Sequence, residues 1–127
     1  MNLEKVFFAF FIVLALTLNF GFFLGELDNP EHHNVYELFA ALVVSLIATI
    51  MKFGDRAHIG AVLLATSLVA DLQLIAAVII WTIFAHATDV GLTPMILASI
   101  VSLSGGALLA NMTSVIILVT ETVMFRR

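Results

Sequence analysis

Asp71 is the residue with the clearest potential for chemistry, because it is a carboxylate near the middle of an otherwise apolar segment. Its local sequence is SLVADLQLI, residues 67–75, with long apolar runs on both sides. On insertion scales, a charged carboxylate at the centre of a membrane-spanning helix costs about 2.5–3.5 kcal/mol. An ionisable residue kept at such a cost is by default a candidate site for a proton or a cation.

Three arrangements could lower the cost of burying Asp71: a cationic partner, a proton on the carboxyl group, or contact with water or a cation in a cavity. No Lys, Arg or His lies in the central part of any apolar segment, which leaves the last two. Asp71 could instead be purely structural, bonding Ser67 one turn back, or Asn111 or Ser45 across a bundle. Such bonds contribute only about 0.6 kcal/mol on average, so we expect an ion-binding or proton-binding role.

The elements that must position these groups are four apolar segments, at residues 3–24, 36–51, 59–87 and 94–125. A spanning helix needs about 20 apolar residues at about 1.5 Å rise each. The chain has 127 residues, of which 62% are hydrophobic and 11% charged, whereas a soluble domain carries roughly 25% charged residues. The sequence therefore predicts an all-α integral membrane protein, with four transmembrane helices forming one domain, residues 1–127, in a lipid bilayer.

The basic residues predict how the chain is oriented in the membrane. All of them lie at the start of the first segment, between the second and the third, or at the end of the chain: Lys5, Lys52, Arg56, Arg126 and Arg127. Four alternating spans place these positions on one side, which the positive-inside rule makes cytoplasmic, together with both termini. We expect a multi-pass protein of the plasma membrane, and its small size favours a bacterial inner membrane.

Polar residues near the midpoints of the other segments are expected to lie at the depth of Asp71. Asn111 is near the midpoint of the fourth segment, Ser45 near that of the second, and Asn19 a little beyond that of the first. Antiparallel helices bring their midpoints to one depth. We therefore expect a polar layer in which Asn111, Ser67 and Ser45 support Asp71 as the ion-binding or proton-binding group.

Helix packing is predicted from a stripe of small residues spaced four apart in the fourth segment: Ala98, Ser102, Gly106, Ala110 and Ser114. Small residues let membrane helices approach closely, here within the chain or between copies of it, and a pore-lining role is less expected. Gln73 lies about 200° around its helix from Asp71, so it is expected to be a packing contact. We expect the third and fourth helices at the centre of the bundle and the Phe-rich first helix at its edge.

Features near the ends of the segments have simpler interpretations. The loop at residues 26–37 holds two histidines and four acidic residues, but their spacing matches no metal motif. We expect a solvated loop, and metal binding stays undetermined. Asn34 is expected to cap the second helix. Glu121 is expected to pair with the C-terminal arginines at the membrane interface.

Several classes of function are not expected. The sequence has no nucleophile–base pair, phosphate loop or basic patch, so we expect no enzyme, no cofactor and no nucleic-acid partner. The leading hypothesis is a small homo-oligomeric channel or transporter for a cation or proton, with Asp71 as the binding group. The alternative is a non-conducting accessory subunit that packs against a larger membrane transport or channel complex.

Overall fold

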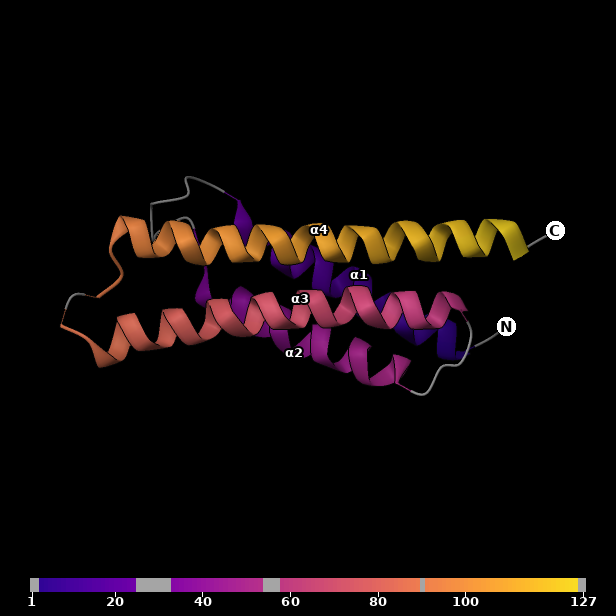
Figure 1. Cartoon of the computed structure of the whole chain (residues 1–127), viewed down its shortest axis with the longest axis horizontal. Coiled ribbons are helices and arrows are strands. Elements are labelled where there is room, and N and C mark those ends of the chain that lie inside the picture. The colour runs from indigo at the N-terminus through magenta and orange to yellow at the C-terminus, as the bar shows by residue number, and fades with distance from the viewer. Residues whose placement is uncertain (1–2, 25–32, 54–57, 90, 126–127) are drawn as a thin grey trace.

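The computed structural model describes residues 3–24, 33–53, 58–89 and 91–125. These residues form the helices shown in Figure 1: α1 (Leu3–Phe23), α2 (Val35–Lys52), α3 (His58–Thr82) with a π-helical extension η2 (Ile83–Ala87), and α4 (Pro94–Phe125). Four helical spans in this part of the chain are long and apolar enough to cross a membrane. The prediction of an all-α protein with four such spans is confirmed, and the predicted ends are correct to within one residue.

The helices form an antiparallel bundle. We call the end where α1 begins and α4 ends the termini end, and the opposite end the far end (Figure 1). The end of α2 and the start of α3 also lie at the termini end. Which end is cytoplasmic stays a prediction from the charge pattern.

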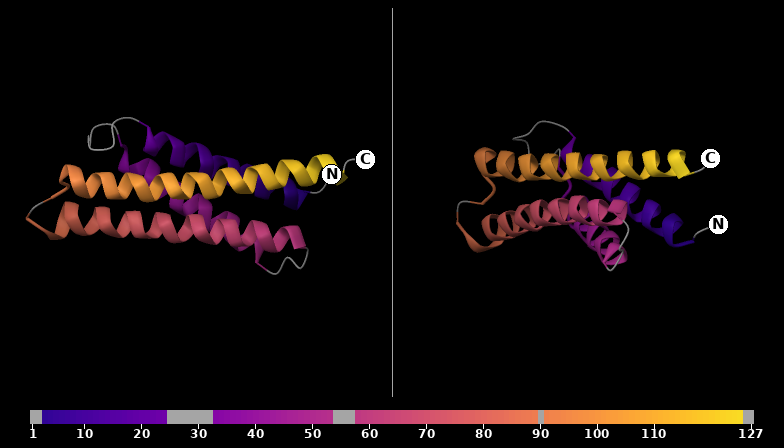
Figure 2. Two further views of the ribbon diagram at one scale, coloured as in Figure 1. Left: turned by 45° about the horizontal axis from the view of Figure 1, so that its top comes forward. Right: turned by 45° about the vertical axis from the view of Figure 1, so that its right-hand side comes forward.

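Each helix packs against two neighbours, so the bundle is a ring. The helix α1 contacts α2 and α4, and α3 contacts the same two helices from the other side (Figures 1 and 2). The expectation that the first helix lies at the edge is therefore wrong. Phe8 and Phe22 of α1 are fully buried, whereas Phe7 and Phe10 are exposed. Aromatic side chains suit both lipid and core, so a high Phe content did not mark this helix as peripheral.

The apolar core is divided into two clusters of buried side chains. The far-end cluster is the larger, and consists of Phe22, Leu38, Ala41, Ala70, Leu74, Ala77, Leu97, Ile100, Val101 and Ala107. The termini-end cluster consists of Phe8, Ile12, Ala48 and Leu63. Some of the buried polar residues lie between the two clusters along the helices, such as Ser45 between Ala41 and Ala48 on α2 and Ser67 between Leu63 and Ala70 on α3. The polar residues expected at one depth are therefore buried in the core of a single chain.

The helix starts follow from local side-chain chemistry. The side chain of Asn34 accepts a hydrogen bond of 2.8 Å from the backbone N–H of Tyr36, so the predicted cap of α2 is confirmed. At the start of α4, Thr93 Oγ1 accepts from the N–H of Ile96 at 3.2 Å, and Pro94 occupies the first turn, where its missing N–H is not needed. These caps fix where α2 and α4 leave their loops.

Candidate functional site

Asp71 lies inside the bundle, with 4% of its surface exposed. Its carboxyl group points from α3 to α2. Ser45 Oγ donates a hydrogen bond of 2.6 Å to Asp71 Oδ1, and Thr49 Oγ1 is hydrogen-bonded to Asp71 Oδ2. Ser45 and Thr49 are four residues apart on α2, so their side chains project from one face, one above the other. Both carboxyl oxygens are therefore held by one helix.

Thr49 has a second acceptor within reach of its hydroxyl group. Thr49 Oγ1 also lies 2.9 Å from the backbone oxygen of Ser45, one turn back in α2. A threonine hydroxyl has one proton, so it donates to only one of these acceptors at a time. When it donates to Asp71, both carboxyl oxygens accept a hydrogen bond from α2, a pattern that suits an ionised carboxylate. When it donates to the Ser45 carbonyl, a protonated Asp71 completes the pattern by donating to Thr49.

Thr49 is the site residue that the sequence reasoning missed. A signal was available, because Thr49 is four residues from Ser45 and both therefore lie on one helix face. A threonine in an apolar run looks unremarkable, since it often bonds its own helix backbone and packs as a β-branched residue. Thr49 belongs to the site because α2 is oriented with its Ser45 and Thr49 face toward Asp71.

Ser67 and Asn111, the other two residues predicted for the site, are both fully buried in the core. In the described part of the chain, Ser67 Oγ and both polar atoms of the Asn111 side chain have no hydrogen-bond partner. The structure thus joins Asp71 directly to Ser45, but not to Ser67 or Asn111.

Two further polar pairs cross the bundle on either side of the Asp71 site. Thr66 Oγ1 and Ser114 Oγ are 2.5 Å apart and join α3 to α4 on the termini side. On the far side, Ser104 Oγ donates to Asn19 Oδ1 at 2.5 Å and joins α4 to α1. Buried hydrogen-bonding groups therefore extend through several turns of the core.

Gln73 faces α4, whereas Asp71 on the same helix faces α2. A methyl group added at Gly106 would overlap the Gln73 side-chain amide, and one at Gly105 would lie 2.8 Å from the Phe23 ring. These glycines therefore permit close approach of α3 and α1 to α4, which runs through them as a continuous helix.

The predicted stripe of small residues is not one contact face. Ser102 is exposed, Ala98, Gly106 and Ala110 are half-buried, and Ser114 is buried. Residues four apart drift by about 40° per step on a helix of 3.6 residues per turn. From Ala98 to Ser114 the stripe therefore turns by about 160°, from the outer surface into the core.

The far end of the core is closed by His33, which was expected in a solvated loop but is buried. Because a carbonyl only accepts, His33 Nδ1 donates to the backbone oxygen of Phe22, at 2.5 Å. The Phe22 ring contacts both the His33 ring and Trp81. Residues 26–32 of the same loop lie outside the described residues. Within the described ranges, no group of three His, Cys, Asp or Glu side chains is placed to hold a metal ion.

At the termini end, Glu121 forms an ion pair with Lys5. Lys5 Nζ lies 2.9 Å from Glu121 Oε1, which joins α1 to α4, whereas Arg126 and Arg127 lie outside the described residues. Lys52, at the end of α2, is buried, and its Nζ lies 4.4 Å from the centre of the Phe8 ring.

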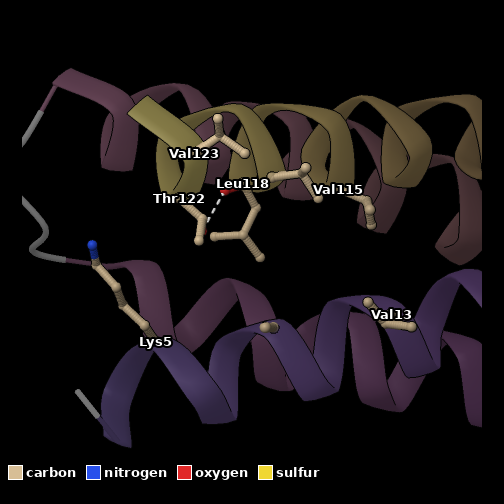
Figure 3. A pocket seen from close by; sticks show the side chains of 8 residues that line it. Lys5, Val13, Val115, Leu118, Thr122 and Val123 are labelled. Atoms are coloured by element: carbon tan, nitrogen blue, oxygen red, sulfur yellow. Dashed lines mark hydrogen bonds between the residues drawn. The ribbon is translucent and has the colours of Figure 1, made fainter. Parts of the chain in front are cut away.

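Three surface cavities, of about 280, 280 and 450 Å³, lie along the seam between α1 and α4. In the cavity at the termini end, Val13 of α1 faces Val115 and Leu118 of α4, and Lys5 lies at its margin (Figure 3). The linings of all three are mainly apolar, and Asp71 lines none of these three. They are separate from the buried polar groups.

Comparison with known proteins gives one match. Residues 32–122 match the model of a family of unknown function, DUF6394. This range contains α2, α3 and most of α4, and with them Asp71, Ser45 and Thr49. No curated protein and no solved structure was found to be similar to the chain.

Proposed function

This chain belongs to the family of unknown function DUF6394, and we propose that it carries protons across a membrane, with Asp71 as the proton-binding group. The observation that supports this most is the Thr49 hydroxyl, which lies between Asp71 Oδ2 and the Ser45 carbonyl. Rotation of this one hydroxyl supplies a complete hydrogen-bond pattern for both the ionised and the protonated carboxyl group. Proton binding and release at Asp71 therefore need no movement of heavy atoms.

The surroundings of Asp71 favour a proton over a metal cation as the ligand. The two hydroxyl groups that contact its carboxyl oxygens come from the same face of α2. A cation such as Ca²⁺ requires about six to eight oxygen ligands around it. Two hydroxyl groups and one carboxyl group, which already bond one another, provide too few oxygen ligands for such a cation. A proton needs only one acceptor.

The division of the core favours a carrier over an open channel. Apolar side chains lie on both sides of the polar layer, in the far-end cluster and the termini-end cluster. Such clusters separate Asp71 from water on either side. A carrier would open one cluster at a time, so that the proton is exchanged with one side and then with the other.

We propose that Asp71 is supported by Ser45, Ser67 and Asn111. We also propose that the chain forms a homo-oligomer in a bacterial plasma membrane. The outer part of the stripe supports self-association, because Ser102 is exposed and small residues permit close helix contact. Chemical cross-linking through Ser102→Cys in membranes tests this contact. A product at the dimer mass is expected, and a purely monomeric product argues against it.

The proposed proton transport is tested in liposomes that contain a trapped pH indicator, with a potassium-driven membrane potential. The original protein should acidify the lumen faster than empty liposomes. Asp71→Asn should reduce this rate to the background, because an amide does not bind and release the proton. Asp89→Asn is the matched control, since Asp89 is exposed at the far end, and it should transport normally. An Asp71→Asn protein that transports like the original would exclude the proposal.

A second candidate is a non-conducting accessory subunit of a larger membrane complex. It is favoured by the fact that both oxygens of Asp71 are bonded to α2, which also suits a carboxyl group that only holds two helices together. In that case the original protein should show no transport in liposomes. A larger partner at fixed stoichiometry should then co-purify with it in mild detergent.

A further inference from the structure

Asn111 is a fully buried asparagine whose side-chain oxygen and nitrogen both have no hydrogen-bond partner in the described part of the chain. Ser67 Oγ, on the neighbouring helix, is in the same situation. A buried polar group without a partner is costly and rare in folded proteins, so three such atoms in one region of a core point to a ligand that binds them.

The register of α3 and α4 places these groups close to the depth of Asp71. The Thr66–Ser114 contact of 2.5 Å fixes this register. Asn111 lies one turn from Ser114 toward the far end, and Asp71 lies one turn from Ser67 in the same direction. The Asn111 side chain is therefore at a depth between Ser67 and Asp71, on the α4 side of the core.

The unpartnered atoms define the chemistry of the ligand. The amide nitrogen of Asn111 only donates, its amide oxygen only accepts, and the Ser67 hydroxyl does either. A metal cation would satisfy the two oxygens but would be repelled by the N–H groups. A water molecule both accepts and donates, and buried waters typically make about three hydrogen bonds to polar groups of this kind.

We infer that Asn111 and Ser67 bind a water molecule on the α4 side of Asp71, and that this water passes protons to and from the Asp71 carboxyl group. The inference rests on the proposed function, because it requires Asp71 to exchange protons. In one transfer, a hydronium ion of the solvent on the termini side, where the Thr66–Ser114 pair lies, gives a proton to the bound water, and the bound water gives one to the Asp71 carboxylate. The hydronium ion becomes a water molecule. The water stays neutral, and the carboxyl group gains the proton.

No other titratable side chain of the described helices lies where it could pass protons to Asp71 in place of the water. On α2, the nearest titratable residue toward the termini end is Lys52, three residues beyond Thr49, and it lies over the Phe8 ring. On α1 and α4, the charged residues are Glu4, Lys5 and Glu121, which are all near the termini end. Within the central turns of the bundle, Asp71 is thus the group that changes charge.

The test uses Asn111→Leu and Ser67→Ala in the full-length protein, with Asn19→Leu as the control at another buried asparagine. Folding is checked by gel filtration and circular dichroism. We expect Asn111→Leu and Ser67→Ala to slow proton transport at least about tenfold, as expected for loss of a positioned proton-transfer group. Asn19→Leu should transport at nearly the original rate, because Asn19 lies on the far side of Asp71, where its Oδ1 accepts a hydrogen bond from Ser104 Oγ.

Infrared spectroscopy supplies a readout that a purely structural role would not change. The original protein should show an O–H stretching band of an internal water that shifts in H₂¹⁸O, and Asn111→Leu should remove this band. The protonated carboxyl band of Asp71 should persist in Asn111→Leu and disappear in Asp71→Asn.

Failure of the inference and failure of the proposed function are distinguishable. If Asp71→Asn stops transport while Asn111→Leu and Ser67→Ala transport normally, the water relay is wrong and the proton carrier stands. If Asp71→Asn transports normally, both are wrong. If no ¹⁸O-sensitive band exists, Ser67 and Asn111 hold no ordered water, and the relay is again excluded.

Discussion

Ser45 Oγ on α2 donates a hydrogen bond of 2.6 Å to Asp71 Oδ1 on α3, so the carboxyl group near the middle of the core is anchored to the neighbouring helix. Together with Thr49, this bond sets the axial position of α2 relative to α3. The Thr66–Ser114 pair does the same for α3 and α4. The register of three helices thus depends on a few hydroxyl groups around one carboxyl group.

Thr49→Val is expected to destabilise the protein by about 1–3 kcal/mol, because it leaves Asp71 Oδ2 buried without its hydroxyl partner while keeping the side-chain shape. The matched control is Thr17→Val. Thr17 is exposed and bonds only the backbone oxygen of Leu14, so a change below about 0.5 kcal/mol is expected. Unfolding by SDS, followed by circular dichroism, measures both. Equal losses in the two variants would contradict the assigned role of Thr49.

The effect of Gly106→Ala on the free energy of unfolding is expected to have opposite signs in the presence and in the absence of the Gln73 side chain. The added methyl group overlaps the Gln73 amide, so the variant should be less stable than the original, since overpacking costs about 1–3 kcal/mol. In a Gln73→Ala background the overlap is gone, and the better helix propensity of alanine should stabilise the protein by up to about 1 kcal/mol. The same unfolding assay measures this cycle. Destabilisation of similar size in both backgrounds would show that another contact excludes the methyl group.

Lys5→Gln is expected to change the free energy of unfolding by less than about 1 kcal/mol, because the Lys5 side chain is 53% exposed in its pair with Glu121. Salt should reduce the difference further, because exposed charges are screened. Unfolding at low and high sodium chloride tests this, with Glu121→Gln as the reciprocal variant. A loss of several kcal/mol that persists at high salt would reveal a buried role for this pair.

The orientation predicted from the basic residues is testable with single cysteines, because the natural sequence has none. Asp89 at the far end and Phe53 at the termini end are both exposed. A membrane-impermeant maleimide should label Asp89→Cys in intact cells, and Phe53→Cys only after the membrane is opened. The reverse labelling pattern would invert the orientation and place both termini outside.

The helices and their limits could be predicted from the sequence because a membrane demands long apolar segments, and the loops interrupt them clearly. Asp71 could also be identified, since a carboxylate in such a segment is costly wherever it points. Antiparallel connection of the segments was enough to expect a polar layer.

The pairing of side chains within that layer could not be predicted in the same way. Exposed residues of these helices are as apolar as buried ones, as Leu72 and Leu74 on α3 show. Because lipid and core accept the same side chains, the sequence does not mark which face of a helix is inside. The bond from Thr49 to Asp71 depends on the rotation of α2, and the burial of His33 depends on its contact with the end of α1 at Phe22.

The ring of Trp81, the one tryptophan in the sequence, lies 6.0 Å from that of Phe22, whose backbone oxygen is bonded by His33. The protein therefore contains its own optical reporter at the far end of the core. Indole emission depends on the polarity around the ring, so water that enters between α1 and α3 would shift it to longer wavelength. The proposed opening and closing at this end would thus be observable in real time without any attached label.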